Sequence, residues 1–294
     1  MAADLGGGVS VSPPFQEVVL GELGDQSFTL LIENNTETTV SLRLSALDFG
    51  SLDDSGGVAF LGGPKDLEKK YGLAEWMRPV PETLTLASGK SEQVLVSIEN
   101  RDNLSPGGHY GAVILRSVGD PSLNALQNGI ALDQIFSVLV YTKKVGGEKY
   151  ALDLEGMDFS HGIFTLPKKV ALRFQNTGNV HVVPRGTLSI MDPRGREVAH
   201  GVINEASSLI LPETPRVFPQ LLFPLGEAFF PGTYHLNIQY RYDGKDDFSL
   251  VSEAFFLLPP LFLVLCGGLF VMLLGYGFYR ARRRKKSPRL SSLS

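Results

Sequence analysis

The sequence predicts an all-β protein with two tandem Ig-like antiparallel β-sandwich domains and one C-terminal transmembrane helix. Three observations lead to this class. Short segments of alternating apolar and polar residues recur over the first 252 residues, separated by turn-forming Asn, Asp, Pro and Gly. A degenerate motif occurs once in each half of that region. An uncharged stretch then precedes a cluster of Arg and Lys near the C-terminus.

The alternating segments are rich in β-branched, aromatic and aliphatic residues, which suit a pleated and half-buried surface. We expect strands over residues 28–32, 40–44, 94–98, 113–115, 136–141, 164–166, 170–174, 186–190, 234–240 and 248–251. Only two soluble segments have helical character, around 65–71 and 121–127. Many short strands of this kind are typical of sandwiches.

The internal repeat supports two domains. Residues 30–36 read three apolar residues and then Glu-Asn-Asn-Thr, and residues 172–179 read Leu-Arg-Phe-Gln-Asn-Thr-Gly-Asn. A Pro-Gly turn follows later in each half. The expected organisation is a flexible N-terminus (1–10), a first Ig-like domain (11–146) with a long insertion lacking strand periodicity (49–81), a second Ig-like domain (147–252), a transmembrane helix (255–279) and a basic cytoplasmic tail (280–294).

The membrane anchor is the strongest signal. The 25 residues from Phe255 to Tyr279 carry no charge, and as a helix they would reach about 37 Å, enough to cross a bilayer core. Lys and Arg beside a span remain cytoplasmic and contact anionic lipid. The residues expected to contact lipid in this way are Arg280, Arg282, Arg283, Arg284, Lys285 and Lys286.

This charge pattern predicts a cell-membrane protein with an extracellular N-terminal ectodomain. The alternative, a tail-anchored protein facing the cytosol, would have to translocate the basic tail. Residues 1–11 have neither the basic start nor the apolar core of a secretory signal peptide, so no signal peptide is present in this sequence. Met1 followed by Ala2, Ala3 and Asp4 would fit a small-residue cleavage site, with a signal peptide removed and a start added, or with the start misassigned.

Net charge and cysteine content exclude some partners. The formal charge is −4, but without the seven cations of the tail 20 Lys and Arg face 31 Asp and Glu, about −11 for the ectodomain. Nucleic acid is therefore not an expected partner. The one cysteine, Cys266, lies in the span, so no intrachain disulfide can form, which favours a bacterial or archaeal surface over a eukaryotic one.

No constellation for catalysis is visible. The sequence has no Cys outside the span, no His-Glu-x-x-His, no Gly-x-Ser-x-Gly and no phosphate-cradling glycine loop, and its five His are scattered singly. Carboxylates at 53–54 and at 243, 246 and 247 are candidate Ca²⁺ ligands, but neither group has EF-hand spacing. We predict no enzyme activity, no cofactor and no metal.

Two short motifs are interpreted structurally. Leu211-Pro-Glu-Thr214 resembles the recognition core of sortase substrates, but Pro215 stands where glycine is required and the span lies much further along the chain, so we predict no transpeptidation. The sequons at Asn34 and Asn103 coincide with predicted turns, and we interpret them as turn chemistry.

The chain also resembles a family of bacterial surface proteins. Segments 28–35, 71–76, 84–86 with Gly89, and 106–113 are similar to the first domain of WxL-interacting proteins, and 174–181, 184–186 and 192–196 are similar to their second Ig-like domain. The resemblance implies a first domain associated with peptidoglycan and a second associated with partner surface proteins. A C-terminal span with a basic tail fits the same layout.

Four residues are candidates for a ligand site in the first domain. If it binds a glycan, Tyr71 and Trp76 would stack on sugar rings, and Arg78 and His109 would supply polar contacts. The alternative for Trp76 is that it fills the sandwich core beneath the long segment. Loss of both fold and binding in Trp76→Ala would indicate the core role, and loss of binding alone the site.

The combined prediction is a non-enzymatic, membrane-anchored cell-surface binding or scaffold protein. Its expected partners are the membrane, and cell-wall glycan (peptidoglycan), another surface protein, or both. The alternative is an assembly chaperone or structural subunit of a surface machine that acts through exposed β-edges.

Overall fold

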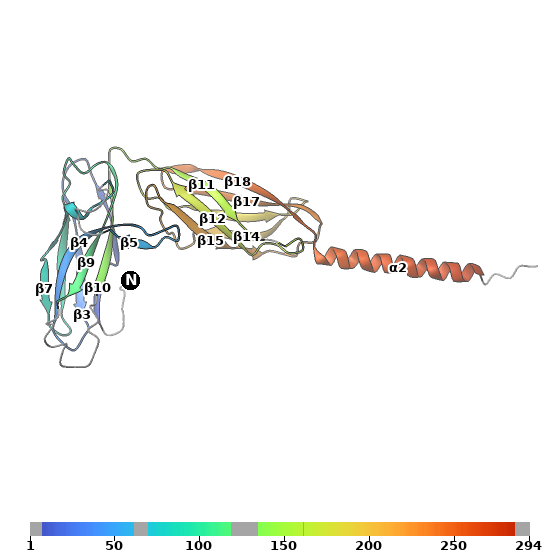
Figure 1. Ribbon diagram of the computed structural model, residues 1–294, viewed down its shortest axis with the longest axis horizontal. Coiled ribbons are helices and arrows are strands. Elements are labelled where there is room, and N and C mark those ends of the chain that lie inside the picture. Colours follow the sequence, from blue (N-terminus) through green and yellow to red (C-terminus); the bar gives the residue numbers. More distant parts are fainter. Residues whose placement is uncertain (1–7, 62–69, 119–134, 161, 286–294) are drawn as a thin grey trace, which may run out of the picture. The chain divides into compact units, whose positions relative to one another are not determined.

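The computed structural model describes residues 8–61, 70–118, 135–160 and 162–285 (Figure 1). The chain divides into two compact units that are discontinuous in sequence. Unit 1 consists of Met1–Glu155, Arg173–Val183 and Leu209–Val217, and unit 2 of Gly156–Leu172, Pro184–Ser208 and Phe218–Ser294. Because unit 1 takes residues from both predicted domains, this division does not test the boundary near 146–147 or the number of sandwiches, which stay predictions.

Unit 1 contains two sheets whose apolar residues meet in one core. Leu30 and Ile32 from one sheet and Val113 and Leu115 from the other belong to the same buried cluster. The first sheet has the order β1 (Val9–Ser12), β3 (Gln26–Asn34), β8 (Ser91–Ile98), β6 (Met77–Val80). The second, here called sheet B, has the order β2 (Phe15–Leu20), β10 (Ile135–Lys144), β9 (Gly107–Ser117), β4 (Val40–Ser51), β5 (Val58–Phe60), with β7 (Thr83–Leu86) also on β4.

The strand order of unit 1 is that of an Ig-like sandwich. The opening strand is split between the sheets, since β1 pairs antiparallel with β3 while β2 pairs parallel with β10. The other ladders of these two sheets are antiparallel. The predicted all-β class is therefore confirmed for the sandwich.

Sheet B is buried on both faces at its centre, where β4, β9 and β10 run next to one another (Figure 1). Successive side chains of a strand point to opposite faces. Val113 and Leu115 of β9 enter the sandwich core, whereas Tyr110, Ala112 and Ile114 form a second cluster with Phe49 and Leu211 on the outer face. Residues 110–115 of β9 consequently do not alternate between apolar and polar, as expected for a strand covered on both sides.

The internal repeat is a shared turn built on a buried asparagine. Asn34 ends β3 and Asn176 ends β12, and neither side chain is exposed. Each amide nitrogen donates to the carbonyl oxygen four residues later at 2.8 Å and to a distant one, that of Leu86 at 3.0 Å or Ile210 at 2.9 Å. Each Oδ1 accepts the N–H two residues later, which is an Asx-turn. The structural interpretation of the Asn34 sequon is confirmed.

Two further sheets follow in the second half of the chain. The three-stranded sheet has the order β11 (Leu152–Asp158), β12 (Lys169–Asn176), β15 (Pro215–Leu221). The five-stranded sheet of unit 2 has the order β16 (Phe223–Pro224), β14 (Glu197–Ile203), β13 (Arg185–Met191), β17 (Gly232–Tyr242), β18 (Lys245–Leu257). Strands at nine of the ten predicted places are confirmed.

Three predicted segments are corrected. Residues 9–10 are not flexible, because Val9 and Ser10 are buried in β1. The insertion 49–81 is not free of strands, since it contains the end of β4, β5, the 3₁₀ helix η1 (Ala74–Trp76) and β6, which pairs with β8. Residues 164–166 form no strand, because Gly162 and Thr165 close a tight turn. Apart from Lys70 and Tyr71, the predicted helical pieces lie outside the described residues.

The C-terminal helix α2 (Pro260–Lys285) starts later than predicted. Phe255, Phe256 and Leu257 belong to β18, where they pair with residues 234, 233 and 232 of β17, so their apolar character serves the sheet. Pro260 opens the helix, a position where its missing N–H costs nothing. The segment Pro260–Arg282 is long and apolar enough to cross a membrane, and none of it is buried.

Candidate functional site

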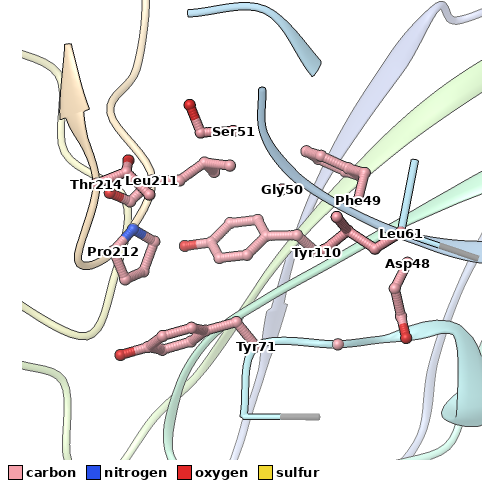
Figure 2. A pocket seen from close by; sticks show the side chains of 11 residues that line it. Asp48, Phe49, Gly50, Ser51, Leu61, Tyr71, Tyr110, Leu211, Pro212 and Thr214 are labelled. Atoms are coloured by element: carbon pink, nitrogen blue, oxygen red, sulfur yellow. Dashed lines mark hydrogen bonds between the residues drawn. The ribbon is translucent and has the colours of Figure 1, made fainter. Parts of the chain in front are cut away.

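A small groove lies on the outer face of sheet B in unit 1. Its volume is about 250 Å³, enough for one or two side chains rather than for a drug-sized molecule. Figure 2 shows Tyr71 and Tyr110 side by side, with their hydroxyl ends toward Leu211 and Pro212. We call this site the Tyr110 groove, and its lining is Asp48, Phe49, Gly50, Ser51, Leu61, Tyr71, Gly72, Tyr110, Leu211, Pro212 and Thr214.

One wall of the groove is fixed by Asp48 at the outer end of β4. Its Oδ1 accepts the backbone N–H groups of Leu73 and Ala74, each at 2.7 Å, and so caps the 3₁₀ helix η1. The segment around Tyr71, which precedes η1, runs along β9, because the N–H of Tyr110 donates to the carbonyl oxygen of Tyr71 at 2.8 Å. A Cβ on Gly72 would lie 2.8 Å from the Asp48 carboxylate, which explains glycine at this position.

An aromatic cluster lies beneath the groove and contributes Phe49 and Tyr110 to its floor. Phe49, Tyr110, Tyr141 and His181 stand edge to face, with ring centroids 5.4 to 6.1 Å apart. Such pairs contribute about 0.5–1.5 kcal/mol each beyond their buried area. The floor is therefore rigid and preformed.

Polar atoms within this floor are paired. The Tyr110 hydroxyl lies 3.2 Å from Nδ1 of His181, whose Nε2 lies 3.5 Å from the Glu17 carboxylate. Burial raises the pKa of the Tyr110 phenol well above its ordinary value. The phenol consequently stays protonated, and its hydroxyl shares a hydrogen bond with the imidazole. Tyr110 is therefore a structural group and not a base.

The opposite wall of the groove is the turn Leu211-Pro-Glu-Thr214. Glu213 has a positive φ of 57°, which is uncommon for a residue other than glycine. Its carboxylate accepts the Tyr71 hydroxyl at 2.9 Å and forms an ion pair with Lys70, whose ammonium lies 5.0 Å from the Tyr71 ring centre. These bonds to Lys70 and Tyr71 lower the pKa of Glu213. The three side chains hold the turn against the β9 side of the groove.

The four sequence-predicted ligand residues do not form one site. Trp76 is 6% exposed in the sandwich core, and its indole N–H donates to Asn103 at 3.2 Å. The ring of His109 lies 6.2 Å from that of Trp76 and is also buried. Arg78 is exposed on β6 and lies 3.7 Å from Glu99. Only Tyr71 lines the groove.

His109 has a special environment. Both ring nitrogens face carbonyl oxygens, Nδ1 that of Gly72 at 3.1 Å and Nε2 that of Ser105 at 2.7 Å. This pair of acceptors favours the protonated ring, but burial outweighs it, so the pKa of His109 is lowered. His109 thus ties the Tyr71 segment to β9.

The described residues of the basic tail and the candidate Ca²⁺ ligands are not part of the groove lining. In the basic tail, Arg280 and Arg282 are exposed on α2, the helix continues to Lys285, and Lys286 lies outside the described residues. The carboxylates of Asp53 and Asp54 are used in a turn and in an ion pair with Arg173. Among the described residues, no group of three His, Cys, Asp or Glu is placed to hold a metal ion.

The lining of the groove supports binding better than chemistry. Its floor and far wall are apolar or aromatic, and the titratable groups at its rim are already paired with each other. A hydrophobic concavity with a few polar groups at its edge is the usual form of a recognition site. The groove therefore suits an apolar side chain of a larger molecule.

Sequence reasoning missed most of this site. Leu211, Pro212 and Glu213 were noticed only as a sortase-like motif, and the structure gives them a place in the groove wall. Tyr110 stood within a Pro-Gly-Gly-His-Tyr turn. The unbroken apolar run 110–115 was the available signal, because a strand covered on both faces implies a second layer above it.

Comparisons with known proteins show distant likeness only. No protein-family model matches the sequence, and no curated protein matches it. Similar solved structures include a chaperone–tip adhesin complex of CFA/I fimbriae biogenesis (TM-score 0.47, 11% identity, covering 85% of this chain and 99% of that chain) and the class 5 fimbriae chaperone CfaA (0.46, 12%, 85% and 99%). The E. coli chaperone DraB is a third (0.39, 13%, 85% and 97%). The resemblance to WxL-interacting proteins stays a prediction.

Proposed function

We propose that this chain is a non-enzymatic, membrane-anchored binding protein that holds a polypeptide partner outside the cell. The observation that carries the proposal is the Tyr110 groove, a preformed apolar site on the outer face of sheet B. Helix α2 would anchor the chain in the membrane, with the basic tail in the cytoplasm. The partner would place an apolar side chain in this groove.

The anchor is supported by the helix itself. Pro260–Arg282 exposes its apolar side chains all round, and a helix with such a surface needs a nonpolar environment to cover it. Arg280 and Arg282 stand at its C-terminal end, where cations favour the cytoplasmic side. Both features support the orientation proposed above.

A polypeptide fits the groove better than a glycan does. Sugar rings require an open aromatic face and several polar groups that converge on hydroxyls. Trp76 and His109, which were expected to supply these, are buried. The groove instead offers Phe49, Leu61 and Leu211, which favour an aliphatic or aromatic side chain.

Binding to a peptide array tests the proposal. The full chain in detergent would be applied to immobilised octapeptides of varied apolar content and, separately, to purified peptidoglycan. We expect retention on apolar peptides and a loss of about tenfold in affinity, equivalent to 1.4 kcal/mol, for Leu211→Ser. The matched control is Leu221→Ser, which alters an exposed leucine of β15 outside the groove.

The results separate the two ligand classes. Retention on peptidoglycan but not on any peptide would contradict the proposal and restore the glycan hypothesis. Equal binding by Leu211→Ser and Leu221→Ser would show that the groove is not the contact site.

A second candidate function is assembly by strand addition. β2 lies at the edge of sheet B and exposes Phe15 and Val19, with Glu17 between them. An unpaired edge with alternate apolar side chains can accept a further strand. Replacing Val19 by Pro would remove a backbone donor from β2. Loss of peptide binding in this variant, with Leu211→Ser still active, would favour the edge over the groove.

A further inference from the structure

Exposed apolar side chains gather at the end of unit 2 from which α2 emerges. Four of them are more than half exposed: Ile163 (58%), Phe164 (52%), Leu225 (63%) and Phe256 (55%). They come from three separate segments, a tight turn, a loop before β17 and the end of β18. We call these four residues the collar.

Direct contacts hold the collar segments at the start of α2. The N–H of Leu258, two residues before the helix, donates to the carbonyl oxygen of Ile163 at 2.7 Å. In the loop that begins at Leu225, the ring of Phe229 lies 6.4 Å from that of Phe262 in the first turn of α2. Phe256 is four residues before Pro260. The collar is therefore continuous with the apolar surface of the helix.

The same loop is braced from within unit 2. The Tyr234 hydroxyl donates to the carbonyl oxygen of Phe230 at 2.8 Å, and the Phe229 and Phe230 rings are 4.9 Å apart. The guanidinium carbon of Arg194 lies 3.4 Å from the centre of the Phe230 ring. A braced loop keeps its apolar residues outward, so their exposure is built into the fold.

We propose that the collar rests in the interfacial layer of the same bilayer that α2 spans, so that unit 2 sits on the membrane surface. This inference rests on the proposed membrane anchor. Scattered exposed apolar residues need no explanation, but a patch that continues a membrane-crossing helix is covered by lipid once the helix is inserted. Because the collar continues the apolar surface of α2, the bilayer is the surface expected to cover it.

Charges near the collar limit its depth. Glu227 is exposed in the same loop and must remain hydrated, whereas Arg194 is placed to meet lipid phosphates. Apolar groups of interfacial elements reach about 5–10 Å into the headgroup and acyl boundary. The collar would therefore occupy the boundary layer and not the hydrocarbon centre.

Spin labels on the full chain test this placement. In a Cys266→Ser background, single variants Phe164→Cys and Leu225→Cys would be labelled and reconstituted in phosphatidylcholine–phosphatidylglycerol vesicles. The aqueous reference is Leu23→Cys, at an exposed turn of unit 1, and the bilayer reference is native Cys266. We expect collisions with a water-soluble nickel chelate to be at least about threefold fewer at 164 and 225 than at 23, as for residues in the interface.

The outcomes separate the collar from the anchor. Labels at 164 and 225 as accessible to nickel as the label at 23, with Cys266 shielded, would overturn the collar and leave the anchor standing. A label at Cys266 that is accessible to nickel would overturn both. Ile163→Cys, on the same turn as Phe164, is the second reporter if either variant fails to fold by circular dichroism.

Discussion

The two faces of sheet B differ in how they are closed. The inner face, with Val113 and Leu115, is part of a core in which aliphatic side chains from both sheets of the sandwich meet. The outer face, with Tyr110 and Ile114, is covered by the segment around Leu211, which leaves the Tyr110 groove open beside it. One strand thus packs its odd residues into the sandwich core and its even ones against the segment that borders the groove.

Substitutions on the two faces should therefore change different quantities. Closed apolar packing responds to substitution through the free energy of unfolding, because cavities cannot collapse fully. An open groove with a rigid aromatic floor responds through affinity, because its rim is already solvated. If substitutions on the two faces changed stability and affinity alike, the faces would not differ in role.

Leu115→Ala should have the largest effect. Leu115 is fully buried in the inner core, and truncating such a residue costs about 3 kcal/mol in the free energy of unfolding. Peptide affinity of the folded fraction should not change. Urea unfolding measures the first quantity, and Arg116→Ala, exposed on the same strand, is the control. A loss of affinity without a loss of stability would reverse the roles of the faces.

Tyr110→Phe should have an intermediate effect. It removes a hydroxyl that is 3.2 Å from His181 inside the floor of the groove, at a cost of about 1–2 kcal/mol. The ring itself stays, so the groove keeps its shape and binding should weaken by less than in Leu211→Ser. Unfolding and peptide titration on the same samples compare the two. A variant as stable as wild type would show that this hydrogen bond contributes nothing.

A pH titration should distinguish the faces without altering shape. Burial lowers the pKa of His109 on the inner side below its ordinary 6.5, so the unfolded chain takes up the proton first. Stability is then fully present above pH 6.5 and decreases as the pH falls toward and through the lowered value. His109→Gln should flatten this part of the profile of melting temperature against pH, and an unchanged slope would contradict the assignment.

The contribution of Glu213, on the outer face, to stability should be lost at a lower pH than that of His109. The pKa of Glu213 is held below its ordinary 4.5, so its contribution is present above that value and is lost as the pH falls through the folded value. Because this carboxylate is exposed, the effect on stability is small. Glu213→Gln should leave the His109 transition intact, which makes it the control for the preceding variant.

Tyr71→Phe should change stability least. Its hydroxyl bonds Glu213 at the solvent-exposed rim, and surface changes of this kind alter the free energy of unfolding by less than about 0.5 kcal/mol. Peptide affinity should fall instead, because the Leu211–Thr214 turn loses its hydrogen bond to Tyr71. A titration calorimeter and a melting curve suffice, and a large stability loss with full affinity would contradict the assignment of this face to recognition.

The all-β class follows from the sequence chiefly through strands whose two faces differ in polarity. β3, β8 and β17 alternate clearly and were found. β6 and β15 were missed since each contains proline, which edge strands tolerate and central strands do not. β2 was missed because both of its faces mix apolar and polar residues, with Glu17 on the outward side and Gln16 on the inward side.

Two errors share one cause. An apolar residue in the sequence does not indicate whether a sheet, the core, solvent or a membrane will lie against it. Phe164 was assigned to a strand and Phe255 to the membrane helix, yet the first is exposed on a turn and the second is buried against Tyr234. The site residues failed for a related reason. The sequence left Trp76 as either a sugar-stacking or a core residue, and only long-range packing places this residue of η1 in the core.

The absence of a linker between β18 and α2 has a mechanical consequence. Leu257 still pairs with Gly232, and the helix begins at Pro260. Backbone hydrogen bonds of an antiparallel ladder run perpendicular to the strands. Tension drawn through the helix along β18 would therefore shear the whole β17–β18 ladder at once instead of unzipping it bond by bond. Under the proposed membrane anchoring, unit 2 would therefore resist force applied where the helix leaves the sheet.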